Sequence, residues 1–189
     1  SSDNEEEDKL PLFSSISELH PSSLHAIENK MKLQNMTEIQ HKTFVAASSG
    51  RDILGRARTG TGKTLAFLLP AIENALRLGR TPGPHTKENG GISILVLSPT
   101  RELAMQIHNQ AQVLTSSHAN SSNNSNRSSR MTSQVMFGGS SRGADLKKLE
   151  DNCPFVLVAT PGRLIDHMQS SYVRGIPFRE IIEGVSVFV

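Results

Sequence analysis

The sequence has 189 residues, of which 36% are hydrophobic and one is a cysteine, and its formal net charge is +2. This length suits one domain and is short for two, and the composition is that of a globular protein rather than a disordered one. The longest apolar runs, 94–97 and 185–189, are too short to cross a membrane, and no charged start followed by an apolar run indicates a signal peptide. The single Cys153 excludes an internal disulfide and is typical of an intracellular, reducing compartment.

The first residues are acidic. Five carboxylates between Asp3 and Asp8 carry a charge of −5, which leaves the rest of the chain at +7. Like charges in a run repel one another and bury no apolar surface, so we expect residues 1–12 to form a disordered tail. The mildly basic remainder, residues 13–189, is compatible with a polyanionic partner.

Apolar runs typical of strands alternate with helical patterns along the rest of the chain. The predicted strands are 52–56, 92–98, 133–137, 155–159 and 185–189, and the predicted helices are 22–32, 37–48, 63–78, 101–114, 143–151 and 162–169. Several strand runs are apolar on both faces, as strands covered by helices on both sides must be. The alternation predicts an α/β fold with a mostly parallel sheet, helices on both faces, and ligands beyond the carboxyl ends of the strands. Two loops interrupt the pattern: the Gly- and Pro-rich stretch 79–91 and a flexible Ser/Asn insertion at 115–130.

The stretch ARTGTGKT, residues 57–64, follows the first predicted strand and opens a helix. Glycines let the backbone curl so that N–H groups point at phosphate oxygens, and the helix N-terminus adds its positive dipole end. Lys63 can reach the β and γ phosphates of a nucleotide, and the Thr64 hydroxyl can bind Mg²⁺. A plain strand-to-helix turn with a surface lysine is the alternative, and the strand before and the amphipathic helix after favour the nucleotide site.

Two further strand ends carry a helix start. In SPTREL, Thr100 is a good helix cap and Arg101 stands beside the N-terminus, where a phosphate could bind, although an ordinary capped helix explains this stretch on physical grounds alone. In VATPGRLID, Thr160 is the predicted cap and Pro161 takes the first helical position. Arg163 is predicted to be exposed there and gains nothing from the positive end of the helix dipole, so a polyanionic partner explains it better than helix stability does.

Together, ARTGTGKT, PTREL and TPGRL resemble motifs I, Ia and Ib of the DEAD-box RNA helicases in order and spacing. The resemblance covers the chain from Phe13 to Val189 apart from the Ser/Asn insertion, and it implies a RecA-like P-loop NTPase domain that binds ATP and Mg²⁺, the metal through Thr64. The nucleotide site that it implies comprises Phe13, Gln40, Ala57, Arg58, Thr59, Gly60, Thr61, Gly62, Lys63 and Thr64, with Lys63 and Thr64 catalytic. It also implies a surface that grips the RNA backbone with little sequence preference, at Pro99, Thr100, Arg101, Gly138, Gly139, Thr160, Pro161, Gly162 and Arg163.

The stretch MTEIQ, residues 36–40, supports two interpretations. Thr37 and Gln40 fit a capping box, in which each side chain binds the backbone N–H of the other residue. The resemblance adds that Gln40 reads the adenine edge, for which its amide supplies both a donor and an acceptor, while Phe13 stacks on the ring. The chain departs from the usual family pattern at Met36, where Pro is common, and at 32–33, where Gly-Phe is common.

A site that hydrolyses ATP also needs an acid at a strand end to hold the metal. Glu102 and Asp166 lie inside predicted helices, and in the family the sequence Asp-Glu-Ala-Asp falls just past the apolar run 185–189. We therefore interpret the chain as a C-terminally incomplete RecA-like domain that keeps a nucleotide grip and part of an RNA surface but not turnover. Its expected partners are RNA and a second RecA-like domain, and no membrane.

Two other interpretations stay open. The chain could be a non-catalytic nucleotide- or RNA-binding module, or a P-loop small-molecule kinase, although a kinase would not need both PTREL and TPGRL. The sequence around Met36 together with ARTGTGKT is similar to a branch of the family with fungal mitochondrial and plant organellar members. Cytoplasm, nucleus, mitochondrion and plastid therefore all stay open as the location.

Overall fold

The computed structural model describes residues 10–80, 91–119 and 131–189. Four parallel strands form a sheet in the order β2-β3-β1-β6. Their bounds are Ser133–Met136 for β2, Val156–Ala159 for β3, Ile94–Leu97 for β1 and Val187–Phe188 for β6. Strand β1 lies at the centre, with Ile94 opposite both Val156 and Val187. The predicted strands at 92–98, 133–137, 155–159 and 185–189 are thus all formed, each over fewer residues.

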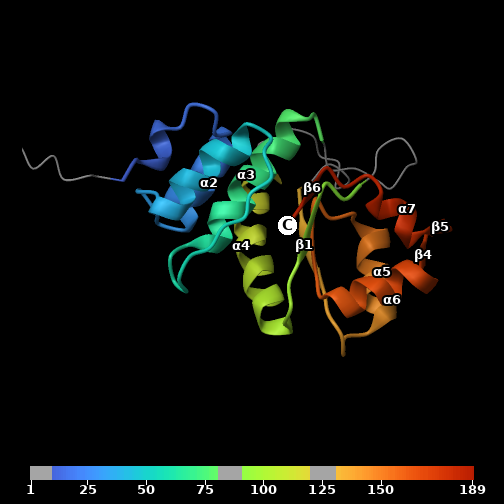
Figure 1. The fold of residues 1–189 in the computed structure, drawn as a ribbon. Helices are drawn as coiled ribbons and strands as arrows, with labels where there is room; N and C mark the ends of the chain where they lie inside the picture. Colours follow the sequence, from blue (N-terminus) through green and yellow to red (C-terminus); the bar gives the residue numbers. More distant parts are fainter. Residues whose placement is uncertain (1–9, 81–90, 120–130) are drawn as a thin grey trace, which may run out of the picture.

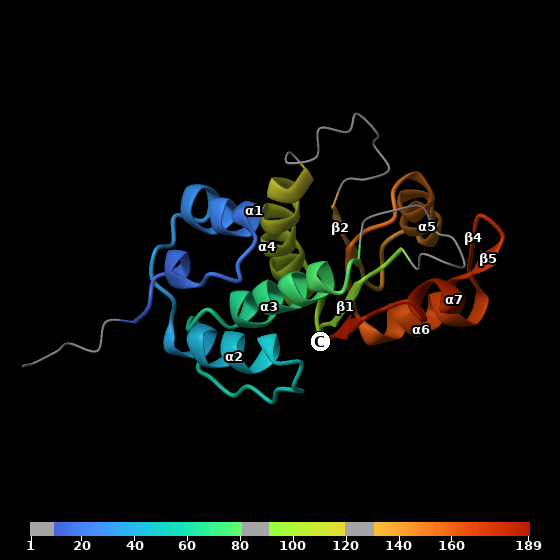
Figure 2. The same cartoon turned by 90° about the horizontal axis from the view of Figure 1, so that it is seen from above.

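Helices cover both faces of this sheet (Figures 1 and 2). The helices on one side are α1 (Pro21–His25), α2 (Glu38–Ser48), α3 (Lys63–Arg77) and α4 (Arg101–Ala119). Those on the other side are α5 (Arg142–Asp151), α6 (Pro161–Ser170) and α7 (Phe178–Ile182). A short hairpin of β4 (Tyr172–Val173) and β5 (Ile176–Pro177) precedes α7. The predicted α/β class, with helices on both faces of a parallel sheet, is confirmed.

The central helix α3 shows why this arrangement forms. Its residues Leu65, Leu68, Leu69 and Ile72 follow the spacing of one helix face, and each is at most 3% exposed. They join one apolar cluster beneath β1 and β3, and a second cluster lies between the sheet and α5, α6 and α7. Cys153 belongs to the second cluster, where burial raises the pKa of its thiol to about 12, so it is a packed core group. In the part of the chain that the structure describes, no helix is long and apolar enough to cross a membrane.

The predicted strand 52–56 is not formed. The segment 51–58 has no regular secondary structure, and the side chain of Leu54 is fully exposed. A strand requires a neighbour that shares its backbone hydrogen bonds, whereas this segment runs apart from β6 with a pocket between them. The prediction of a strand at 52–56 is therefore wrong, because an apolar run does not by itself supply the pairing partner.

The boundaries of the predicted acidic tail and of the predicted insertion also change. Residues 10–12 are not a tail, because Leu12 pairs with Asn35 in an antiparallel bridge and the carbonyl of Pro11 accepts the N–H of Met36 at 2.8 Å. The insertion does not begin at 115, because α4 continues to Ala119. The remaining residues of both predictions, and most of the predicted loop 79–91, lie outside the described residues.

A buried polar cluster explains the extension of α4 and fastens α1 to α3 and α4. The Ser23 hydroxyl donates to Glu73 Oε1 at 2.5 Å and lies 2.8 Å from His118 Nε2, while the N–H of His20 donates to Glu73 Oε2 at 3.0 Å. Burial raises the pKa of the Glu73 carboxyl and lowers the pKa of His118 to about 4. His118 therefore serves as a neutral hydrogen-bond partner inside the fold. The Ser- and Asn-rich sequence around it gives no indication of this role.

Candidate functional site

The loop of residues 57–62 curls around the amine of Lys63. Lys63 Nζ donates to the carbonyl oxygens of Ala57 and Arg58, both at 2.6 Å. The Thr61 hydroxyl donates to the same Arg58 carbonyl at 2.9 Å. Gly60 and Gly62 both adopt a φ of +82°, a conformation that glycine reaches without steric cost. The loop is therefore closed on its own lysine by contacts that a bound anion would replace.

The N-terminus of α3 is suited to an anion. Gly62 is its N-cap and accepts the N–H of Ala66 at 3.1 Å, but it carries no side chain to satisfy the amides of the first turn. Those amides belong to Lys63, Thr64 and Leu65, and the helix that follows has 15 residues. Free N–H groups and the dipole of a long helix both favour a phosphate at this position. Thr64 is half-buried here, in the first turn, where its hydroxyl could join a metal held by the phosphates.

Gln40 connects α2 to this loop. Its Oε1 accepts the N–H of Thr37 at 2.8 Å, and its own N–H donates to the Thr37 hydroxyl at 3.4 Å, which confirms the predicted capping box. Its Nε2 also donates to the carbonyl of Gly62 at 3.2 Å, and the residue is 5% exposed. The amide thus retains one N–H and one lone pair, and its contact with adenine stays a prediction.

Phe13 lies away from the surface. Its side chain is 0% exposed and belongs to the apolar cluster under the sheet, and its N–H donates to the carbonyl of Gln34 at 2.9 Å. A ring that stacks on adenine must offer a free face, and Phe13 offers none in this arrangement. The reason is that residues 10–12 pair with the segment before α2, which turns the following ring into the core.

The other predicted site residues gather at the carboxyl ends of β1, β2 and β3. The N–H of Ser98 donates to the carbonyl of Ala159, and the N–H of Thr160 donates to that of Met136, both at 2.9 Å. These bonds hold the three strand ends at one edge of the sheet. The Thr100 hydroxyl accepts the N–H of Leu103 at 3.2 Å, which confirms it as the cap of α4. Thr160 occupies the N-cap position of α6 before Pro161, but its hydroxyl makes no capping bond there.

Arg101 rests on the glycine pair that follows β2. A Cβ atom added to Gly139 would lie 2.9 Å from Arg101 Nη1 and 3.1 Å from its Cζ. Gly139 has a φ of +94°, whereas Gly138 has open space around it. Arg101 itself is exposed. An exposed guanidinium therefore lies directly over Gly139, one of the two glycines that the family resemblance assigns to the RNA surface.

The prediction that Arg163 is exposed is wrong. Arg163 is 8% exposed, its Nε donates to Asp145 Oδ2 at 2.9 Å, and its Nη2 donates to the carbonyl of Ser140 at 2.5 Å. His167 lies 3.3 Å from the same carboxylate oxygen. The partner residue Asp145 stands 18 positions earlier on another helix, so nothing in the local sequence around Arg163 indicates it. Sequence reasoning therefore missed Asp145 and His167, because the contact between Asp145 and Arg163 joins two different helices.

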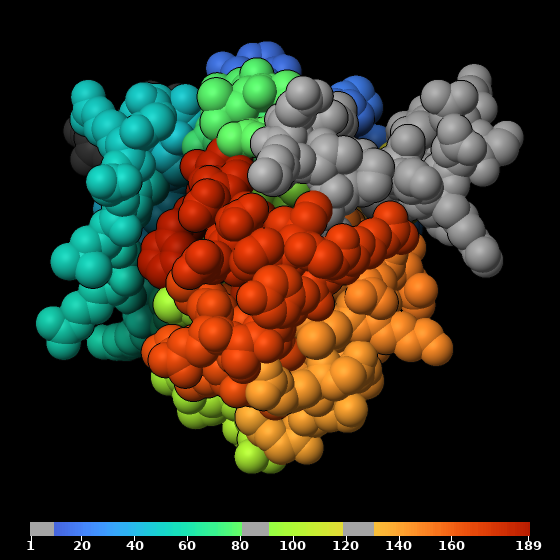
Figure 3. Space-filling model, turned by 90° about the vertical axis from the view of Figure 1, so that its right-hand side faces the viewer, coloured from blue at the N-terminus to red at the C-terminus, as the bar shows by residue number. Residues whose placement is uncertain are grey.

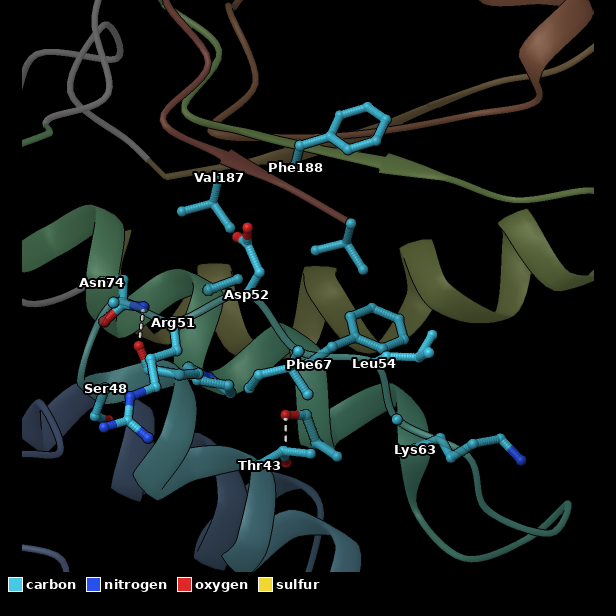
Figure 4. Close-up of a pocket in the computed structure, with 18 of the residues that line it drawn as sticks. Thr43, Ser48, Arg51, Asp52, Leu54, Lys63, Phe67, Asn74, Val187 and Phe188 are labelled. Atoms are coloured by element: carbon cyan, nitrogen blue, oxygen red, sulfur yellow. Dashed lines mark hydrogen bonds between the residues drawn. The ribbon is translucent and has the colours of Figure 1, made fainter.

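A pocket of about 1070 Å³ opens beside α3, between the segment 51–55 and β6 (Figure 4). Phe67 of α3 and Val187 of β6 belong to opposite walls, and most other lining side chains are apolar. The amine of Lys63 points away from this pocket toward its own loop, although Lys63 and Thr64 both belong to the pocket lining. The pocket therefore reaches the start of α3, where that loop ends.

The comparisons with known proteins identify the class of protein that has this fold. Residues 37–189 match the DEAD/DEAH box helicase family. Since the match covers most of the chain, the chain belongs to this family.

Relatives and solved structures share this assignment. The chain is 42% identical over 160 residues to the human ATP-dependent RNA helicase DDX18, with 84% of the chain and 21% of that protein covered. It is 41% identical over 165 residues to the ATP-dependent RNA helicase has1 of Aspergillus clavatus, covering 86% of the chain and 23% of that protein. The yeast DEAD-box splicing factor Prp28 superposes with a TM-score of 0.68 at 30% identity, over 89% of this chain and 37% of that one. The chain thus spans about a fifth of the length of these curated relatives.

Proposed function

We propose that this chain forms the ATP-binding half, and part of the RNA-binding surface, of an ATP-dependent RNA helicase. The observation that carries the proposal is the meeting of three motif-bearing segments at one edge of the sheet, with Arg101 resting on Gly139. Family membership and the names of the relatives support the same activity. In this proposal, ATP binding closes a second RecA-like domain onto the chain, and the closed pair bends one RNA strand until a short duplex separates.

ATP with Mg²⁺ fits the residues of the loop 57–62 and the start of α3. Lys63 would exchange the carbonyls of Ala57 and Arg58 for the β and γ phosphates, and the uncapped amides of α3 would bind the phosphate oxygens. The Thr64 hydroxyl would take one position on Mg²⁺, which neutralises charge that develops on the phosphates during transfer. Gln40 would use its remaining N–H and lone pair for adenine, while Phe13 supports the fold from the core.

RNA would bind at the carboxyl ends of the strands through its backbone. The residues that we assign to this surface are Pro99, Thr100, Arg101, Gly138, Gly139, Thr160, Pro161 and Gly162. Arg101 supplies an exposed positive charge, and the start of α6 supplies the N–H of Gly162, which no side-chain cap covers. Contacts of this kind position a phosphate chain without reading bases, so we expect little sequence preference and a strong dependence on salt.

The test is ATP hydrolysis, with and without single-stranded RNA, by the protein expressed from its complete reading frame. We expect RNA to stimulate hydrolysis, and Lys63→Ala to lower kcat/KM by at least about 100-fold, because the lysine acts on charge that develops in the transition state. Lys147→Ala, at an exposed position on α5, is the matched control and should leave the rate unchanged. Nucleotide binding without any RNA-stimulated hydrolysis by the unaltered protein would instead support a non-catalytic binding module.

A further inference from the structure

Two ion pairs join helices α5 and α6, and the cation lies on α5 in one pair and on α6 in the other. Arg142 of α5 pairs with Asp166 of α6, with 3.2 Å between Nε and Oδ2. Asp145 of α5 pairs with Arg163 of α6, with 2.9 Å between Oδ2 and Nε. Each helix thus contributes one cation and one anion, three residues apart and on one helix face. We call these four residues, together with His167, the α5–α6 clasp. The face formed by α5, α6 and α7 is seen in Figure 3, in orange to red.

The inner ion pair of the clasp is buried. The Asp145 side chain is 5% exposed, and its Oδ2 receives both Arg163 Nε and, at 3.3 Å, His167 Nε2. Burial alone would raise the pKa of the Asp145 carboxyl, but hydrogen bonds from His167 and Arg163 and the charge of Arg163 outweigh it, and the pKa is lowered. A buried carboxylate with one of its two partners removed leaves an uncompensated charge, which makes this pair sensitive to substitution.

The same guanidinium fixes the turn that precedes α5. Arg163 Nη2 donates to the backbone carbonyl of Ser140 at 2.5 Å, and the Ser140 hydroxyl lies 3.4 Å from Asp145 Oδ2. The Ser140 hydroxyl also donates to the carbonyl of Phe137 at 2.9 Å, which closes the turn around Gly138 and Gly139. Arg163 is therefore engaged by its own chain on two sides, and it ties the glycine turn to the start of α6.

The outer ion pair completes the clasp at the other end of α6. Arg142 Nη2 donates to the hydroxyls of Ser170 and Ser171, at 2.7 and 3.0 Å. The Ser171 hydroxyl in turn lies 2.9 Å from His167 Nδ1, on the opposite side of the ring from Asp145. The contacts thus run from Asp145 through His167 and Ser171 to Arg142, and they hold the first turn of α5 against α6.

We propose that the α5–α6 clasp is a positioning device of the RNA surface, and that Asp145 is its central positioning residue. The proposal rests on the proposed function. Successive phosphates of a strand are linked covalently, so two protein segments that contact them must lie at a fixed separation in the complex. Holding the segments at that separation before RNA binds reduces the conformational entropy that is lost on binding. The clasp fixes the glycine turn against the start of α6, while Arg101 and the backbone amides contact the phosphates. Arg163 acts in the clasp rather than on the RNA.

Asp145→Asn tests this proposal, with Asp151→Asn on the same helix as its matched control, because Asp151 is exposed. The measurement is the Kd of the complete protein for a fluorescent single-stranded oligouridylate, with a non-hydrolysable ATP analogue, across a series of KCl concentrations. We expect Asp145→Asn to weaken binding by at least about tenfold and Asp151→Asn to change it less than about twofold, since Asp145 is the buried ionic partner of the Arg163 guanidinium. The slope of log Kd against log [KCl] should stay the same for both, because neither residue contacts a phosphate.

Two further variants separate positioning from direct contact. Arg101→Ala should weaken binding and also reduce the salt slope by about one, as the loss of a phosphate contact does. Arg142→Ala, which removes the outer pair without placing a new charge beside Asp145 or Arg163, should weaken binding about threefold and leave the salt slope unchanged. A reduced slope in Arg142→Ala would mean that Arg142 itself contacts a phosphate, which would count against the clasp.

Each other result overturns the inference. Tighter binding by Asp145→Asn would mean that Asp145 competes with phosphate for Arg163. A reduced salt slope in Asp145→Asn would mean that Arg163 contacts RNA directly. A lower Tm with an unchanged Kd would give the clasp a role in stability alone. If the unaltered protein binds no RNA, the proposed function fails and this inference fails with it, whereas normal binding by both the unaltered protein and Asp145→Asn refutes only the inference.

Discussion

Two glycines with left-handed backbone lie in the two parts of the site, and the side chain of another motif rests on each. Gly62, at φ +82°, lies beneath Gln40, and Gly139, at φ +94°, lies beneath Arg101. The two side chains that lie on these glycines differ in how freely they can move. Gln40 is 5% exposed and its amide is held by bonds to Thr37 and Gly62, whereas Arg101 is exposed and only the far end of its side chain touches the glycine. Glycine is therefore needed at 62 to leave room for a fixed side chain, and at 139 mainly for its backbone conformation.

The largest expected effect is that of Gly62→Ala. The new Cβ would overlap Gln40 Nε2 and lie 3.3 Å from its Cδ, so the amide must give up its bond to the Gly62 carbonyl. Together with the left-handed φ, this should lower the free energy of unfolding by about 2–4 kcal/mol. It should also weaken ATP binding strongly, because the start of α3 shifts. Thermal unfolding and a nucleotide titration measure the two effects.

Gly60→Ala is the matched control for that substitution. Gly60 has the same φ of +82°, but a Cβ there meets nothing within 4 Å. Without nucleotide, Gly60→Ala should therefore lower the free energy of unfolding only by the strain of a left-handed alanine backbone, about 1–2 kcal/mol. Equal losses for the two variants would show that Gln40 moves aside freely, and the contrast between Gly62 and Gly139 would then be wrong.

A double-mutant cycle between Gln40 and Gly62 isolates the contact itself. Gln40→Ala removes the side chain that the new Cβ would displace, so Gly62→Ala should cost less in that background than in the unaltered protein. We expect a coupling free energy of about 1–2 kcal/mol, which is the part of the loss that comes from the displaced amide. If the two losses of unfolding free energy, measured by thermal unfolding, are strictly additive, the displaced Gln40 amide makes no contribution. The loss in Gly62→Ala then comes from the left-handed backbone conformation alone.

These contrasts also show what the sequence could predict. The capping box of Thr37 and Gln40 and the cap of α4 at Thr100 depend on residues three positions apart, so local reasoning found both. The second bond of Gln40, to the Gly62 carbonyl, joins residues 22 positions apart and could not be found in that way. The glycines of residues 57–64 indicated a curled loop, but not that the Gln40 side chain lies against Gly62.

The errors have the same origin. A strand at 52–56 was predicted from its apolar run, yet a strand forms only against a partner, and the sequence does not state which edge is within reach. Arg163 was predicted to be exposed from its place at the start of a helix, where it gains nothing from the helix dipole, whereas Asp145 reaches it across the packed faces of α5 and α6. Phe13 was assigned to the nucleotide site by resemblance, and the pairing of residues 10–12 places it in the core.

The smallest expected effect is that of Gly139→Ala on RNA binding. A Cβ at Gly139 would lie 2.9–3.1 Å from the guanidinium atoms of Arg101, which must move by a few tenths of an ångström. Because that end of the side chain is free to move, the contact adds little to the backbone cost, and we expect RNA affinity to fall about three- to fivefold, or roughly 1 kcal/mol. Gly138→Ala, which meets nothing within 4 Å, should change affinity less than about twofold.

Testing Gly139→Ala in a protein that already carries Arg101→Ala shows how Gly139 contributes to RNA affinity. If Gly139 matters to RNA chiefly because it seats Arg101, then Gly139→Ala should have little further effect on RNA affinity once Arg101 is shortened, since the displaced group is already gone. If the loss persists unchanged in that background, the strained backbone of the turn itself shifts away from the phosphate. The same RNA titration distinguishes the two outcomes. A loss that disappears in the Arg101→Ala background would mean that Gly139, like Gly62, makes room for the side chain of another motif.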